Sequence, residues 1–182
     1  MERSDGILIQ ETLDGFLSAF DELMVRYQQL VFKVAYSFGG NRENALDITQ
    51  TVFFKAWDKL GTFRSESSFK AWLLRIAYNE GINWTQSPRN RRDLHESLNE
   101  SADYHASEAA QETKLLHMEQ RRILDRGLSS LNDRYRTAIL LRYSHEMSIR
   151  EIAGVLQCSE TMTKNILFRS IRNLKKALAQ AG

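Results

Sequence analysis

The chain has 182 residues, of which 42% are hydrophobic and 26% are charged, so it is not disordered throughout and can bury one large core or two small ones. One proline and nine glycines are too few turn residues for an all-β sandwich or barrel, and we expect an all-α fold. A single cysteine, Cys158, excludes an internal disulfide and a multi-thiolate metal site, and four scattered histidines do not replace those ligands. We therefore expect no metal and no cofactor.

The sequence also gives an expectation for location. No apolar run reaches the roughly 18 residues of a transmembrane helix, and the first twelve residues, MERSDGILIQET, carry acids where a signal peptide has a basic segment. We expect a cytoplasmic protein that does not insert into a membrane.

Charge is distributed unevenly along the chain. It is −2 over residues 1–86, +3 over 87–92, −6 over 93–112 and +7 over 113–182. A basic C-terminal segment behind an acidic stretch favours a polyanion-binding module behind a linker, although a solvated basic surface would give the same pattern.

Three amphipathic helices are predicted in the first 88 residues, because apolar side chains recur there at spacings of three and four. They form a bundle of three helices, or of four if residues 7–16 add a short one. Expected boundaries are Gly39 and Gly40 after the first helix, Asn41 and Gly61 around the second, and Ser67 or Ser68 and Pro88 around the third.

Residues 87–112 have few large apolar side chains and no sustained periodicity, which is typical of a linker. Four helical patterns follow, and the last two read as a helix, a tight turn and a helix, capped by Ser148 and Ser159. Gln157 lies in the turn, where such motifs often have Gly. We predict two small helical domains, 1–92 and 113–182, joined by a flexible acidic linker over 93–112.

The last helix has an inner apolar face and an outer face of hydrogen-bonding and basic side chains. Such a face suits the major groove of duplex DNA, and an ordinary helical hairpin with a basic solvent face is the alternative. The outer residues are Thr161, Lys164, Asn165, Phe168, Arg169 and Arg172.

Two further candidate surfaces lie in the N-terminal bundle. Asp47 and Gln50 share a helix face beside the apolar segment TVFFKAW, which suits a protein partner or is simply solvated. For Trp57 and Trp72 we expect core packing. Aromatic, amide and Arg side chains suited to unstacked single-stranded bases follow: Phe63, Arg64, Ser65, Asn79, Asn83, Trp84, Arg89, Arg91 and Arg92.

Several motifs together resemble a known family. They are the DxxQ of Asp47 and Gln50, the FR of Phe63 and Arg64, the AWL at 71–73, the IAxN ending at Asn79, and the helix-turn-helix. In this combination the chain resembles bacterial RNA polymerase sigma factors, with the second and fourth conserved regions and an acidic linker as in the minimal extracytoplasmic-function (ECF) subfamily.

The resemblance implies a sigma factor that binds core RNA polymerase, directs it to promoter DNA and helps to melt the minus-10 element, often under stress. It implies contacts with the β′ clamp coiled coil and the β flap, with an anti-sigma factor as a further partner. To the β′ contact we assign Asp47, Gln50, Phe53 and Phe54. The set from Phe63 to Arg92 above is assigned to the minus-10 element, and Ser148, Arg150, Thr161, Thr163, Lys164, Asn165, Phe168, Arg169 and Arg172 to the minus-35 element.

The main alternative is a free-standing helix-turn-helix regulator that binds duplex operator DNA without polymerase. An enzyme is not expected, because the chain has no Gly-rich phosphate loop, no HExxH, no GxSxG and no Cys/His pair at catalytic spacing. We accordingly expect no catalytic residues.

Overall fold

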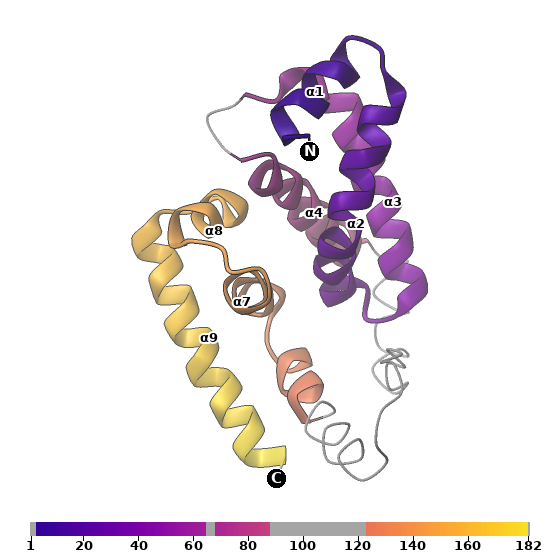
Figure 1. The fold of residues 1–182 in the computed structure, drawn as a ribbon. Coiled ribbons are helices and arrows are strands. Elements are labelled where there is room, and N and C mark those ends of the chain that lie inside the picture. The colour runs from indigo at the N-terminus through magenta and orange to yellow at the C-terminus, as the bar shows by residue number, and fades with distance from the viewer. Residues whose placement is uncertain (1–2, 65–67, 88–122, 182) are drawn as a thin grey trace, which may run out of the picture.

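The computed structural model describes residues 3–64, 68–87 and 123–181, and all regular structure in these ranges is helical, which confirms the predicted class (Figure 1). None of these helices is long and apolar enough to cross a lipid bilayer. The elements are α1 (Asp5–Leu13), α2 (Leu17–Gly39), α3 (Arg42–Lys59), a 3-10 turn (Leu60–Thr62), α4 (Phe69–Gln86), a helical stretch over 123–129, α7 (Asp133–Ile139) with a π-helical turn (Leu140–Ser144), α8 (Ile149–Leu156) and α9 (Glu160–Ala181).

Local signals at the helix ends of the N-terminal bundle are confirmed with one exception. Asn41 and Ser68 cap α3 and α4 through their side chains, and Gly40 ends α2 in the left-handed conformation, with φ of 74°. Gly61 does not end α3, because the chain tightens from Lys59 into a 3-10 turn. The prediction of a glycine terminator there was wrong.

The additional short helix considered for residues 7–16 is present as α1 (Asp5–Leu13), which packs on α2. Leu8 and Ile9 of α1 are buried, and the Asp5 carboxylate accepts hydrogen bonds from Arg26 at 2.6 Å and from the Tyr27 hydroxyl. The N-terminal bundle therefore has four helices.

Helices α2 and α4 cross closely at Gly81. A Cβ added there would lie 2.2 Å from a ring carbon of Phe38, which is only 1% exposed and has no room to move. Only glycine fits this crossing, which fixes how α4 lies in the bundle.

Gly81→Ala should therefore lower the free energy of unfolding by about 1 to 3 kcal/mol, the usual cost of overpacking a core. As a control, Gly154→Ala places its Cβ in open space on α8 and should stabilise by about 0.5 to 1 kcal/mol through helix propensity. Urea unfolding measures both. A Gly81→Ala protein as stable as wild type would contradict the close crossing.

The N-terminal helices α1–α4 and the C-terminal residues 123–181 lie against each other, with α8 beside α4 and α7 beside α2 (Figure 1). Their buried side chains belong to one continuous apolar cluster. The connecting residues 88–122, which contain the predicted linker, lie outside the described residues.

Candidate nucleic-acid interface

Helices α8 and α9 form a helix, a tight turn and a helix. Ser148 and Glu151 make a reciprocal capping box at the start of α8, and the Ser159 hydroxyl accepts a hydrogen bond from Met162 N–H at the start of α9. Gln157 ends α8 in the left-handed region at φ 52°. Ile152 and Ile166 are among the buried residues that hold the two helices together.

The outer face of α9 presents the predicted DNA-contacting side chains with one exception. Phe168 is 68% exposed, and the polar and basic residues around it on the same face are exposed as well. Thr163 is fully buried, its hydroxyl lies 3.3 Å from Cys158 Sγ and donates to Ser159 O at 3.1 Å. Its side chain faces the core and has no access to DNA, which corrects its assignment to the minus-35 set. The exposed residues are Thr161, Lys164, Asn165, Phe168, Arg169 and Arg172.

The start of α8 adds to this face an exposed arginine, Arg150, and a serine, Ser148, whose hydroxyl is already hydrogen-bonded within the chain. Ser148 is also exposed, but its hydroxyl donates to the Glu151 carboxylate at 2.8 Å. These hydrogen bonds hold the pKa of Glu151 below its usual value and keep the capping box intact. The Ser148 hydroxyl is therefore engaged in the capping box of the free chain.

Helix α4 carries a face of amide and aromatic side chains. Trp72, Asn79 and Asn83 follow one another at helical spacing, and the Phe63 ring lies edge-on to Trp72 with centroids 5.5 Å apart. Trp72 packs against the core, as expected from the sequence, but it is only half-buried and its exposed part belongs to this face.

The other predicted base-contacting residues are distributed unevenly around this face. Arg64 is exposed at its edge, and Trp84 is half-buried against the core. Four assigned residues lie outside the described residues, namely Ser65, Arg89, Arg91 and Arg92.

Helix α3 presents an exposed stripe that mixes polar and apolar side chains. Asp47 and Gln50 are exposed, and Phe54 is 72% exposed beside them. Phe53 is only 6% exposed and packs in the bundle core, which corrects its assignment to a partner surface.

Two residues that the sequence reasoning missed extend this stripe, which we call the α3 stripe (Leu46, Asp47, Gln50, Phe54 and Trp57). Leu46 and Trp57 are 46% and 41% exposed, although core packing was expected for Trp57. One edge of the Trp57 ring meets Phe20 at 4.9 Å between centroids. The spacing 46, 50, 54, 57 is the signal that would have revealed the stripe.

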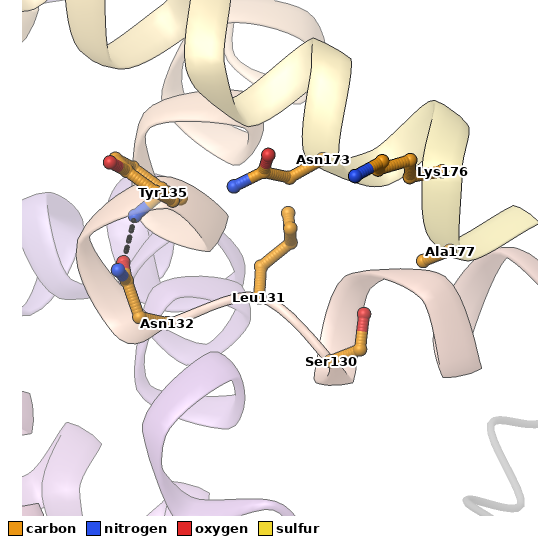
Figure 2. A pocket seen from close by; sticks show the side chains of 7 residues that line it. All are labelled: Ser130, Leu131, Asn132, Tyr135, Asn173, Lys176 and Ala177. Atoms are coloured by element: carbon orange, nitrogen blue, oxygen red, sulfur yellow. Dashed lines mark hydrogen bonds between the residues drawn. The ribbon is translucent and has the colours of Figure 1, made fainter.

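A hollow lies between the start of α7 and the C-terminal half of α9 (Figure 2). Leu131 points toward Asn173 of α9, and Lys176 lies on the rim. Asn132 caps α7 by accepting a hydrogen bond from Tyr135 N–H at 2.9 Å, which fixes the wall on that side. A hollow that combines the apolar side chains of Leu131 and Ala177 with polar neighbours suits a side chain of a protein partner.

His145 is buried where the C-terminal helices meet the N-terminal bundle. Burial, together with charge repulsion from Lys33 of α2 and Lys70 of α4, lowers its pKa to about 4. Among the described residues, its Nε2 atom has no hydrogen-bond partner. The side chain is therefore neutral in the folded chain.

Folding stability should consequently fall as the pH drops from 6.5 toward 4, because the unfolded chain binds the His145 proton near pH 6.5 and the folded chain only near pH 4. The loss from this residue approaches about 3 kcal/mol at the acid end. Urea unfolding of wild type and His145→Gln across this range measures it. If the variant loses as much stability as wild type, another group causes the acid sensitivity.

A helix-turn-helix with an exposed basic and amide face, next to a bundle with an aromatic and amide face, defines a two-part DNA-binding protein. Profiles of known families match both parts, Sigma-70 region 2 over residues 23–91 and Sigma-70 region 4 over residues 121–174. The chain is 31% identical to the ECF RNA polymerase sigma-E factor of Escherichia coli over 92% of its length and 90% of that protein. It is 29% identical to the RNA polymerase sigma-H factor of Pseudomonas aeruginosa over 97% and 95%.

Two solved structures share the fold. CnrH in complex with the cytosolic domain of CnrY matches with a TM-score of 0.70 and 24% identity over 98% of this chain and 99% of that one. RpoE in complex with the anti-sigma factor NepR from Bartonella quintana matches with a TM-score of 0.66 and 24% identity over 88% and 96%.

The chain therefore belongs to the sigma-70 family of RNA polymerase sigma factors, in its ECF subfamily. Its function is to bind core RNA polymerase and direct it to promoters. Like other sigma factors it is not an enzyme.

Proposed function

We propose that the α3 stripe docks the chain on the β′ clamp coiled coil of core polymerase. The stripe combines the carboxylate of Asp47 and the amide of Gln50 with the exposed rings of Phe54 and Trp57. Aromatic side chains that stay exposed in the free protein are the usual anchors of an interface, and flanking polar groups set its register. The exposure of Phe54 is the observation that supports this docking site best.

For the β flap, we propose the hollow of Figure 2 as the contact on region 4. It is concave, it lies farther along α9 than the DNA-contacting face, and Leu131 is among the residues that line it. A flap side chain seated there would leave the face around Phe168 accessible to DNA.

Region 2 should read the minus-10 element as single-stranded DNA through Phe63, which precedes α4, and through α4 itself. Phe63, Asn79 and Asn83 lie along one side of this region, and rings and amides suit flipped bases. Stacking and hydrogen bonds to an extruded base offset the few kcal/mol of unstacking, so binding itself favours the melted form.

Region 4 should read the minus-35 element as duplex DNA through the outer face of α9, with Arg150 of α8 at its edge. Linking two weak DNA contacts makes the second one intramolecular, which raises the affinity of the whole chain. The domain limits 1–92 and 113–182 and the linker 93–112 belong to this proposal.

An anti-sigma factor is proposed as a further partner. The solved structure of CnrH, which shares this fold, is a complex with the cytosolic domain of CnrY, and that of RpoE is a complex with the anti-sigma factor NepR. Such a partner would compete with core polymerase for the α3 stripe, so its addition should reduce holoenzyme formation.

Run-off transcription tests the proposed function. Core polymerase with this chain should produce a defined transcript from DNA upstream of the chain's own gene, and core polymerase alone should not. Binding of the chain to that duplex without polymerase, with no polymerase-dependent transcript, would instead support a free-standing regulator.

A further inference from the structure

Helix α9 exposes two large apolar side chains on a face that is otherwise polar and basic. Met162 is 47% exposed and Phe168 is 68% exposed. Asn165, which is also exposed, lies three positions after Met162 and three before Phe168. Residues at this spacing form one row across a helix surface, which we call the α9 row (Met162, Asn165 and Phe168).

The orientation of the α9 row is fixed by the other side of the helix. Thr163 is fully buried and Ile166 is only 4% exposed, so the residues that follow Met162 and Asn165 face the core. Met162 is the third residue of α9, and its N–H donates to the Ser159 hydroxyl at 3.2 Å. Met162 therefore belongs to the first turn of the recognition helix, the part that reaches base edges in a helix-turn-helix.

The chemistry of Met162 restricts what it can contact there. Its thioether has no hydrogen-bond donor and no charge, so it gains little from a phosphate oxygen or from the polar edge of a base. In the major groove, the 5-methyl of thymine is the apolar group that distinguishes one base edge from the others. A flexible methionine side chain packs readily on such a group.

The spacing of the α9 row matches neighbouring base pairs. Residues three apart lie about 4.5 Å apart along a helix axis, and successive base pairs are about 3.4 Å apart. In zinc fingers, three residues at similar spacing on one helix contact three successive bases. The amide of Asn165 suits the edge of adenine, so the base pair next to that adenine is the one within reach of Met162.

We propose that Met162 determines promoter specificity by packing on the 5-methyl group of a thymine in the minus-35 element, next to the base pair that Asn165 reads. This inference rests on the proposed function, because it requires α9 to enter the major groove. The other three bases offer no methyl group at that position, so the chain discriminates against them through a contact that involves no hydrogen bond.

Met162→Gln removes the apolar contact and keeps the length and the helix propensity of the side chain. Because Met162 is exposed, the fold should be unaffected. Met24→Gln is the matched control, since Met24 is also partly exposed, at 36%, and lies on α2 in region 2.

Deoxyuridine, which is thymidine without the 5-methyl group, isolates the contact on the DNA side. Holoenzyme first selects its preferred minus-35 element from duplexes randomised there, and each thymine of that element is then replaced singly by deoxyuridine. At one position the replacement should weaken binding of wild-type and Met24→Gln holoenzyme about fourfold, the effect of one buried methyl group. Met162→Gln holoenzyme should bind the two duplexes equally.

Asn165→Ala tests the register of the α9 row, because it should relax the preference at the base pair adjacent to the responsive thymine. A preferred element in which no thymine responds, a response that persists in Met162→Gln, or a responsive thymine that is not adjacent to the Asn165 pair would overturn the role of Met162. Each of these results would leave the reading of minus-35 by α9 intact. Selection that yields no preferred minus-35 element would instead overturn the proposed function of region 4.

Discussion

Asp47→Lys should weaken binding to core polymerase by at least about 30-fold, or about 2 kcal/mol. Asp47 is exposed near the N-terminal end of the α3 stripe, so its carboxylate becomes desolvated only when a partner covers the stripe. Reversing a charge in a desolvated contact loses the attraction and leaves the opposing charge unpaired. Equilibrium titration of fluorescent chain with core polymerase measures the change.

Asp21→Lys is the control, since it makes the same charge change at an exposed position on α2. It should leave the affinity for core polymerase unchanged. Equal affinity of Asp47→Lys and wild type, with unfolding curves that coincide, would exclude the α3 stripe as the docking site.

The neighbouring rings Phe53 and Phe54 extend this test. Phe54→Ala should weaken polymerase binding with little effect on stability, because the ring is 72% exposed. Phe53→Ala should instead lower the free energy of unfolding by about 3 to 5 kcal/mol, because that ring is 6% exposed and packs in the core.

Phe53 and Thr163 were both assigned to partner surfaces, although helical spacing places each of them on a buried side. Phe53 follows Val52 and precedes Ala56 on the buried side of α3, and Thr163 precedes Ile166 by three positions on the buried side of α9. Phe53 was assigned as part of the apolar segment beside Asp47 and Gln50, and Thr163 was assigned through the family resemblance, although the spacing of the last helix leaves it off the outer face. Position on the helix decides which residues a partner can reach.

Capping residues were predictable because capping is local. Asn41, Ser68 and Ser148 each bond a backbone N–H three residues along the chain, so the signal and its effect lie within one turn. The prediction that Gly61 ends α3 was wrong because a 3-10 turn can end a helix without a residue in the left-handed conformation.

Docking of region 4 on region 2 could not be predicted in this way. The hydrogen bond between Gln157 and Asn79 joins residues 78 positions apart, and no periodicity of either helix specifies it. The sequence showed only that Gln157 replaces the usual glycine of the turn. The structure supplies a reason for the side chain, because its amide reaches α4.

Lys164 and Arg169 on α9 should have different roles in binding the minus-35 element, although both are exposed. Lys164 lies near the start of the recognition helix, where side chains reach base edges, and Arg169 lies farther along, where the helix leaves the groove beside phosphate. Lys164→Ala should cost about 1 to 3 kcal/mol at one base pair and relax the preference there. Arg169→Ala should weaken binding alike on all sequences and reduce the slope of log K against log salt by about 0.9, as expected for one lost phosphate contact.

Holoenzyme binding to a panel of promoters varied across minus-35, at several salt concentrations, separates the two effects. Lys59→Ala is the control for loss of one positive charge, because this exposed lysine lies at the end of α3 in region 2, and it should change neither the slope nor the preference. If Lys164→Ala and Arg169→Ala both behave like Lys59→Ala, α9 does not enter the groove, and its basic face is a solvated surface. If Lys164→Ala lowers the salt slope without changing the base preference, this lysine contacts phosphate as well. Base reading would then rest on the exposed neighbours Asn165, which can hydrogen-bond a base edge, and Phe168, which can pack on a thymine methyl group.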